Sequence, residues 1–220
     1  GKAGSGITEM IIIPSSDNYT YCIDGDTHQQ IWKAALTGPA VAPVKAALPS
    51  RRVYISSTSP KADSGGVIHV FDVDTGTLLW LRSATSADKT RTHGIHTVPA
   101  IDDMRNGMAF YAYGGRIIAY DSMTGHISGS VNGTEADPFR SSPVLSADAK
   151  NLFVHSANGG LWRYSLTDSP VTDGANNTVT MTLDWVCTYH PISIDDGTVG
   201  KTCYYTPTDM LEGIDRKSVV

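Results

Sequence analysis

Residues 67–80 read VIHVFDVDTGTLLW, and this stretch decides the fold of the chain. A run of strand-forming residues ends at Asp72, a Thr-Gly pair follows at Thr75 and Gly76, and a second apolar run ends at Trp80. Strand-forming residues on both sides of turn-forming residues are typical of a β-hairpin. The stretch therefore predicts two antiparallel strands joined by a tight turn.

The same pattern recurs along the chain in less complete copies. They are YTYCIDGDTHQQIW at 19–32, RIIAYDSMTGHISG at 116–129, LWRYSLTD at 161–168 and MLEGID at 210–215. The equivalent positions follow one another at steps of 48, 49, 44 and 50 residues, and they are Asp24, Asp72, Asp121, Ser165 and Asp215. A period of this length predicts the four-stranded blades of a β-propeller.

A second landmark recurs in phase with the first. Each repeat opens on a proline followed by an apolar residue, at Pro43, Pro99, Pro143 and Pro191. About ten residues later comes an aromatic or β-branched run, as at 53–55, 110–112, 152–154 and 203–205. We predict that the proline-led strand is innermost in each blade and the aromatic run is second. The strand that ends at the aspartate is then third, and the strand with the tryptophan is outermost.

Composition is compatible with one all-β domain. The chain has 220 residues, of which 40% are hydrophobic, and this is enough for a sizeable core. The formal net charge of −5 argues against a nucleic-acid partner, because no basic stripe is available for phosphates. No apolar run is long enough to span a membrane. No segment has sustained helical periodicity.

The pattern Asp-x-x-Thr-Gly-x-x-x-Trp resembles the pyrroloquinoline-quinone-type repeat of quinoprotein alcohol dehydrogenase-like β-propellers. The resemblance runs from Met10 to Asp215, although Gly129 replaces the tryptophan of the third copy and the fourth copy lacks the Asp and the Thr-Gly pair. The phase of the repeats predicts about four and a half blades, and the resemblance implies a ring of seven or eight, so we expect the chain to be a fragment. Residues 1–215 form this partial domain. The tail at 216–220 resembles a translated sequencing adapter, or it is an ordinary basic terminus.

The resemblance implies either an enzyme or a non-catalytic relative such as the bacterial outer-membrane assembly lipoprotein. The enzymes hold pyrroloquinoline quinone over calcium, beside an adjacent cysteine pair, which this chain lacks. The aspartates at the repeat positions face tight turns, where a carboxylate accepts backbone N–H groups, and we predict this role for Asp24, Asp72, Asp121 and Asp215. For Asp102-Asp103 and Asp195-Asp196 we predict solvated turns. We therefore expect no catalytic residue, no metal site and no cofactor.

Basic and imidazole side chains lie in the loops that lead to the innermost strands. In a propeller these loops surround one mouth of the central channel, so they could form a site for an anionic or carbohydrate ligand from His93, His96, Arg140 and His190. Alternatively, each side chain caps its own loop or bonds a carbonyl of the neighbouring blade.

We predict structural roles for the tryptophans and the cysteines. We predict that Trp32, Trp80 and Trp185 pack between neighbouring blades and that Trp162 lies in the core. Cys22, inside a strand, is expected to be buried. A hairpin centred near Gly197 would place Cys203 opposite Ile192 rather than Cys187, while a Cys187–Cys203 disulfide remains the alternative.

The location of the protein is suggested by three Asn-x-Ser/Thr sequences, which all fall in predicted turns or loops. They begin at Asn18, Asn132 and Asn176. They favour a secreted or cell-surface glycoprotein.

Together, the features of the sequence predict a non-catalytic propeller that binds partner proteins or copies of itself. The alternative is a fragment of a quinoprotein-like oxidoreductase whose quinone and calcium residues lie in missing blades.

Overall fold

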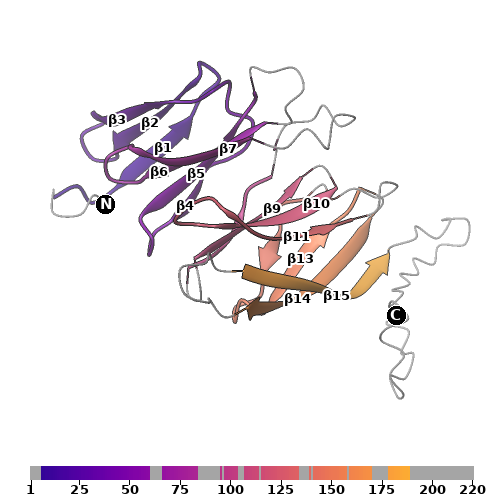
Figure 1. Cartoon of the computed structure of the whole chain (residues 1–220). Helices are drawn as coiled ribbons and strands as arrows, with labels where there is room; N and C mark the ends of the chain where they lie inside the picture. The colour runs from indigo at the N-terminus through magenta and orange to yellow at the C-terminus, as the bar shows by residue number, and fades with distance from the viewer. Residues whose placement is uncertain are drawn as a thin grey trace, which may run out of the picture.

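The computed structural model describes residues 6–59, 66–83, 95, 97–103, 107–113, 115–133, 139, 141–157, 159–169 and 178–188. These residues form strands and turns and contain no helix. The strands make one three-stranded and three four-stranded antiparallel sheets, which follow one another along the chain (Figure 1). In the part of the chain that the structure describes, there is thus no helix that could cross a membrane.

Each sheet is built from consecutive strands. The first consists of β1 (Met10–Pro14), β2 (Tyr19–Asp24) and β3 (Gln30–Ala35). The second consists of β4 (Lys45–Ala47), β5 (Arg52–Ser57), β6 (Val67–Asp72) and β7 (Leu78–Ser83). The third consists of β8 (Ala100–Asp102), β9 (Met108–Tyr113), β10 (Arg116–Asp121) and β11 (Ile127–Asn132). The fourth consists of β12 (Val144–Leu145), β13 (Asn151–His155), β14 (Gly160–Ser169) and β15 (Thr178–Thr188).

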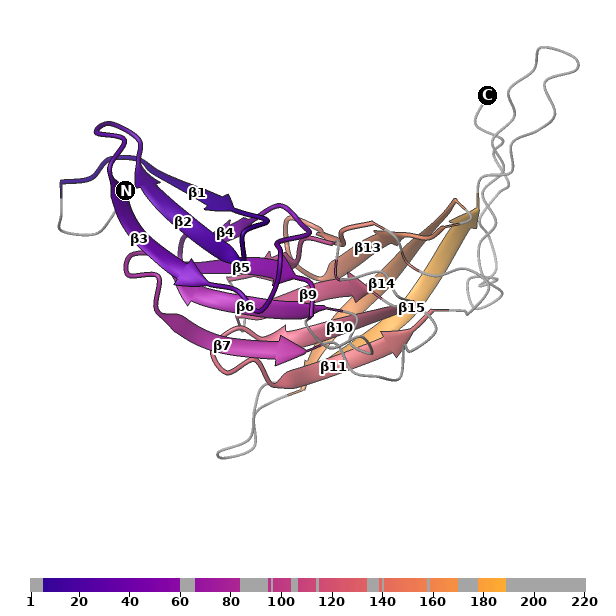
Figure 2. The same cartoon turned by 90° about the horizontal axis from the view of Figure 1, so that it is seen from above.

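The order of strands in the four-stranded sheets is the predicted one. Pro43, Pro99 and Pro143 stand just before β4, β8 and β12, where the missing N–H removes no ladder bond. Figure 2 shows the sheets packed face to face along an arc, as neighbouring blades of a propeller are. The prediction of an all-β propeller is therefore confirmed, and we call the sheets the first to fourth blades. The predicted fifth repeat, around Asp215, lies outside the described residues, and the size of the ring stays a prediction.

A β-bulge recurs at one place in every blade. The register between the third and outer strands shifts after a pair that always includes the tryptophan position of the repeat. These pairs are Cys22–Trp32, Val70–Trp80, Ala119–Gly129 and Arg163–Trp185. A bulge adds one residue to one strand and strengthens the local twist. Positions one period apart thus occupy matching places in all four blades.

Trp32 and Trp80 pack on the turn of the following blade. The indole Nε1 of Trp32 donates to the carbonyl oxygen of Val73 at 2.9 Å, and that of Trp80 donates to the carbonyl oxygen of Ser122 at 2.8 Å. Each acceptor directly follows a repeat aspartate. Both tryptophans are only 6% exposed, so the prediction that they pack between blades is confirmed for this pair.

The glycine of the Thr-Gly pair makes room for each indole. A Cβ on Gly76 would lie 2.6 Å from the ring of Trp32, and a Cβ on Gly125 would lie 2.7 Å from the ring of Trp80. Both glycines also have positive φ, of 69° and 68°. A side chain at either position would be strained and would strike the indole. The tryptophan and the glycine of the repeat are therefore two halves of one contact between blades.

The third and fourth blades meet without this contact. A Cβ on Gly129 would lie 2.2 Å from the carbonyl oxygen of Val179, so the backbone of β15 fills the place that an indole takes elsewhere. The fourth repeat has no Thr-Gly turn, and its β14 and β15 run on for 10 and 11 residues. The tryptophan and its receiving glycine are thus lost from the same seam.

The other two tryptophans are less deeply placed than predicted. Trp185 is half-buried and packs against Phe153, with ring centroids 6.3 Å apart. Trp162 is also half-buried and lies at the border of the core, edge-on to Phe139 at 5.5 Å. Cys22, in contrast, is fully buried as predicted. No blade follows the fourth within the described residues, so the packing of Trp185 between blades stays a prediction.

Candidate functional site

The four predicted loop residues His93, His96, Arg140 and His190 lie outside the described residues. Three of them, His93, His96 and Arg140, precede the described residues Val98 and Ser142 in the sequence. The backbone N–H of Val98 donates to the Ser142 hydroxyl at 2.9 Å, so the loops that lead to β8 and β12 lie side by side. The predicted channel-mouth site itself stays a prediction.

The repeat aspartates stabilise turns, as predicted. Asp24 Oδ1 accepts the backbone N–H groups two and three residues later at 2.9 and 3.2 Å. Asp72 and Asp121 accept the corresponding N–H groups at 2.8–3.0 Å and also the hydroxyls of Thr75 and Thr124. The N–H groups that it accepts lower the pKa of Asp24 below its usual value. Asp215 lies outside the described residues.

The acidic pair at the end of β8 differs from its prediction. Asp102 is only 5% exposed, and Oδ1 of Asp103 is buried, so this pair is less solvated than predicted. Asp103 lies close enough to Tyr54 of the second blade to influence its pKa, as does Arg52, which is 9% exposed. Burial is the main cause that raises the pKa of Tyr54. Asp103 therefore lies at the seam between the second and third blades. The pair Asp195-Asp196 lies outside the described residues.

A hollow opens in the same seam, on the outer side of the second and third blades. Its volume is about 330 Å³, and it is lined by Arg82, Ser83, Tyr113, Ile118, Tyr120, His126 and Ile127. The buried side chains of Tyr113, Ile118 and Tyr120 form its inner part, whereas Ser83, His126 and Ile127 are exposed. The hollow therefore combines an apolar interior with a border that solvent can reach.

Arg82 supplies the fixed charge of the hollow. Its Nε donates to the carbonyl oxygen of Gly125 at 2.7 Å, and its Nη2 donates to that of Thr124 at 3.3 Å. Because both acceptors belong to the next blade, the guanidinium is held across the seam. Below it, the hydroxyls of Tyr113 and Tyr120 share a buried hydrogen bond of 2.6 Å. Burial raises the pKa of Tyr120, so this phenol stays neutral at physiological pH.

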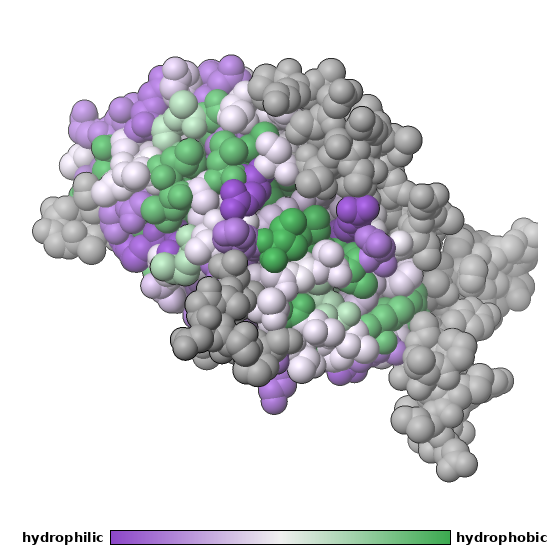
Figure 3. Space-filling view, in the orientation of Figure 1, coloured by the Kyte–Doolittle hydropathy of each residue, from purple (hydrophilic) through white to green (hydrophobic). Residues whose placement is uncertain are grey.

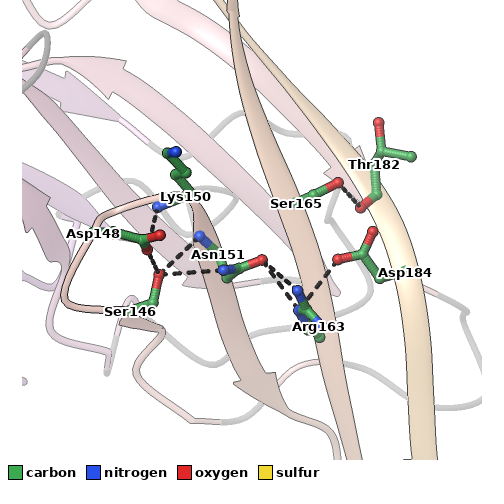
Figure 4. Close-up of polar contacts among 8 residues, drawn as sticks. All are labelled: Ser146, Asp148, Lys150, Asn151, Arg163, Ser165, Thr182 and Asp184. Atoms are coloured by element: carbon green, nitrogen blue, oxygen red, sulfur yellow. Dashed lines mark hydrogen bonds and ion pairs between the residues drawn. The ribbon is translucent and has the colours of Figure 1, made fainter.

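The fourth blade has a polar group where the other blades have apolar residues (Figure 4). Arg163 occupies the position of Cys22 and Val70, both fully buried. Its Nε and Nη2 donate to Asn151 Oδ1 at 3.1 and 2.9 Å, and it pairs with Asp184 at 3.3 Å. Asp184 balances the charge of the guanidinium and Asn151 accepts two of its hydrogen bonds, so its partners lie within the blade itself. We therefore regard this group as structural.

The described residues do not fit a quinone and calcium site. No group of three or more His, Cys, Asp or Glu side chains with a geometry suited to a metal ion occurs among them. Calcium requires six to eight oxygen ligands. The repeat aspartates already accept two backbone N–H groups each within their own turns. We derive no catalytic step from these residues.

Two of the predicted glycosylation sites can be placed. Asn18 is exposed in the turn before β2, and Asn132 is the exposed last residue of β11 rather than part of a loop. Asn176 lies outside the described residues. Cys187 is disulfide-bonded, and its partner also lies outside the described residues. Cys203 lies outside the described residues, so its pairing with Cys187 stays a prediction.

Residues 8–172 show which known family the chain resembles. They match the family described as outer membrane protein assembly factor BamB. The chain belongs to this family. The resemblance to pyrroloquinoline-quinone-type propeller repeats is thereby confirmed. No curated protein matches the chain.

Solved structures agree on the fold. BamB from Moraxella catarrhalis is 20% identical, with a TM-score of 0.55, and the match covers 71% of this chain and 46% of that one. Sqt1 from Saccharomyces cerevisiae is 14% identical, with a TM-score of 0.54 over 82% of this chain and 54% of that one. The dihydro-heme d1 dehydrogenase NirN is 13% identical, with a TM-score of 0.56 over 91% of this chain and 44% of that one. The chain thus spans about half the length of the structures that it matches.

Proposed function

We propose that the chain is part of a non-catalytic β-propeller that binds protein partners and acts in assembly. The observation that carries the proposal is the hollow between the second and third blades, because apolar interiors with a few polar groups are typical of binding sites. Two rigid blades hold this surface in place, so little conformational entropy is lost on binding. The name of the family, an assembly factor, is compatible with this role.

Exposed apolar side chains support the same proposal. Figure 3 shows apolar residues in several separate patches on one face of the molecule. The large exposed ones include Leu79, Met123, Ile127 and Val144, which lie on strands and turns of three different blades. Such surfaces are commonly interaction sites.

The first blade has a further surface of this kind. Ile11 and Ile13 are 41% and 42% exposed, whereas Val53 and Ile55, at the same repeat positions of the second blade, are fully buried. In the second blade the first blade covers this face. We propose that another β-sheet covers Ile11 and Ile13 in the assembled protein, either from the same ring or from a further copy.

Selection of random peptides displayed on phage against the whole chain tests the binding function. We expect one or more peptide families whose binding is lost when Ile127→Asp places a charge at the border of the hollow. Leu78→Asp is the matched control, because Leu78 occupies the same repeat position in the second blade and does not line the hollow. Absence of any selected peptide that depends on Ile127 would reject the proposed binding site.

We also propose a location outside the cytoplasm. The disulfide at Cys187 supports an oxidising compartment, and the family name refers to the outer membrane. The exposed Asn18 and Asn132 support a secreted or surface glycoprotein if the source is a eukaryote.

Treatment with an N-glycosidase is expected to lower the intact mass of protein purified from a eukaryotic secretory host. Asn18→Gln and Asn132→Gln should each remove one increment of that mass, because both side chains are accessible. Asn151→Gln, outside any acceptor sequence, is the control and should change nothing. An unchanged mass after enzyme treatment would contradict the glycoprotein proposal.

A second candidate function is the binding of an anionic or carbohydrate ligand at the channel mouth. The hydrogen bond between the loops of Val98 and Ser142 supports it, since it brings neighbouring loops together. Arg140→Ala and His190→Ala should each weaken the binding of any such ligand found by calorimetric screening of glycans and small anions. Unchanged binding in both variants would rule out this site.

A further inference from the structure

We propose that the hollow between β7 and β11 binds an extended segment of a partner protein in which an apolar side chain stands next to an aspartate or glutamate. This inference rests on the proposed function, because it names the chemistry that the same site recognises. It is argued from the shape, the polarity and the charge of the hollow.

The size and interior of the hollow suit a single apolar side chain. About 330 Å³ lies at the lower end of the volumes typical of ligand pockets, so a large cofactor is a poor fit. Ile118, Tyr120 and Tyr113 are 5%, 2% and 7% exposed and form the interior. Ile127, which is 55% exposed, extends the apolar surface to the border. An inserted leucine-sized side chain would cover this surface and be buried itself.

The charge of the hollow favours a carboxylate beside that side chain. Arg82 is the only lining residue with a permanent charge, and no Asp or Glu lines the hollow within the described residues. Carbonyl oxygens of Leu81, Thr124 and Gly125 take three of the five N–H groups of its guanidinium. Among the described residues the other two N–H groups have no acceptor, and charge-assisted hydrogen bonds to carboxylates are stronger than neutral ones. His126 at the border could add a donor.

The hollow is also prepared for binding before a partner arrives. The seam is held by the Trp80 indole on one side and by Arg82 across the turn of the third blade. Because the two outer strands β7 and β11 contribute to its border, a partner chain can lie along the seam in an extended form. A preorganised site of this kind needs few anchors to be selective.

Three synthetic peptides test the inference on the full 220-residue chain. The first is Ac-Ser-Gly-Leu-Asp-Gly-Ser-NH₂, the second has Lys in place of Asp, and the third has Ser in place of Leu. NMR titration of the ¹⁵N-labelled protein should show the first peptide binding about tenfold more tightly than either of the others. The perturbed resonances should belong to residues around Tyr113, Tyr120 and Ile127. Raising the salt concentration should reduce the preference for Asp over Lys.

Matched variants locate the effect. Ile127→Asp should weaken binding of the first peptide at least about tenfold by adding a repelling charge, whereas Leu78→Asp should leave it unchanged. Arg82→Met, which keeps the apolar stem, should abolish the preference for Asp over Lys. Equal affinity of the Asp and Lys peptides, or perturbations far from the hollow, would overturn the inference. If phage selection still gives peptides that need Ile127 but carry no acidic residue, only the inference fails and the binding function stands.

Discussion

Replacing Trp80 with alanine is expected to lower the free energy of unfolding by about 3 to 5 kcal/mol. The indole is 6% exposed and fills the seam between the second and third blades. Its ring centroid lies 6.2 Å from that of Tyr54 and 6.2 Å from that of Tyr120. Alanine would leave a cavity there and would also leave the Ser122 carbonyl without its indole donor. Urea unfolding followed by circular dichroism measures the change.

Two further variants show whether the loss comes from this contact. Leu79→Ala, at the 43% exposed neighbouring position, should change stability by less than about 0.5 kcal/mol. Gly125→Ala should lower stability by about 1 to 3 kcal/mol, because its Cβ would strike the indole. In the Trp80→Ala background the same substitution should have a smaller effect, since the ring is gone. A loss below about 1 kcal/mol for Trp80→Ala would contradict the contact.

The fold could be predicted because its signals are local and periodic. A turn in which an aspartate accepts the N–H groups two and three residues later involves only a short segment, so the sequence can predict it. Such a turn is predicted for Asp72, and Asp72 makes it in the structure. The proline before each innermost strand is another such signal. A repeated local signal fixes the phase of a blade, and consecutive blades can then be arranged only side by side.

Burial at the seams could not be predicted in the same way. Asp102 ends β8 and Asp103 begins the turn that follows, and turns are usually solvated. Asp102 is nevertheless only 5% exposed, and Asp103 lies close to Tyr54, about 50 positions earlier in the chain. The pairing of Gly129 with the backbone of Val179 is equally hidden, because it depends on how far β15 extends. Contacts between blades depend on the relative positions of two repeats, which one repeat does not encode.

The hollow was also missed at the level of sequence, although one signal for it exists. Arg82 stands two residues after Trp80 in the same strand, so both side chains point to the same face and toward the next blade. A charged residue on a face that packs against another blade must find partners there. The remaining lining residues come from β9, β10 and β11, and only the folded structure brings them together with Arg82.

Lowering the pH is expected to destabilise the protein through His69. This imidazole is 1% exposed in β6, its Nε2 accepts the backbone N–H of Thr37 at 3.2 Å, and its ring stacks on Phe71. Burial lowers the pKa of His69 from 6.5 to about 4, while weak interactions with the backbone of Ile55 and Val67 act in the opposite direction. The native state therefore keeps this ring neutral down to about pH 4.

The sign of the effect follows from the two pKa values. Above pH 6.5 the ring is neutral in both the folded and the unfolded chain, so its contribution to stability is fully present. Between pH 6.5 and about 4 the unfolded chain binds a proton that the native state excludes, and the contribution is progressively lost. The total loss is about 3 kcal/mol, since each unit of pKa difference corresponds to about 1.4 kcal/mol.

Comparison of the parent protein with His69→Gln separates the contribution of His69 to the pH dependence of stability from that of the carboxylates, which titrate in the same range. Glutamine can accept the Thr37 N–H and does not titrate, so unfolding free energies of the variant should fall less steeply between pH 6.5 and 4. His126→Gln, at an exposed position, is the control and should follow the parent. If His69→Gln does not fold, His69→Phe, next to the stacked Phe71, replaces it. Parallel pH profiles of the parent and the His69 variant would show that the ring is not excluded from protonation in the folded protein.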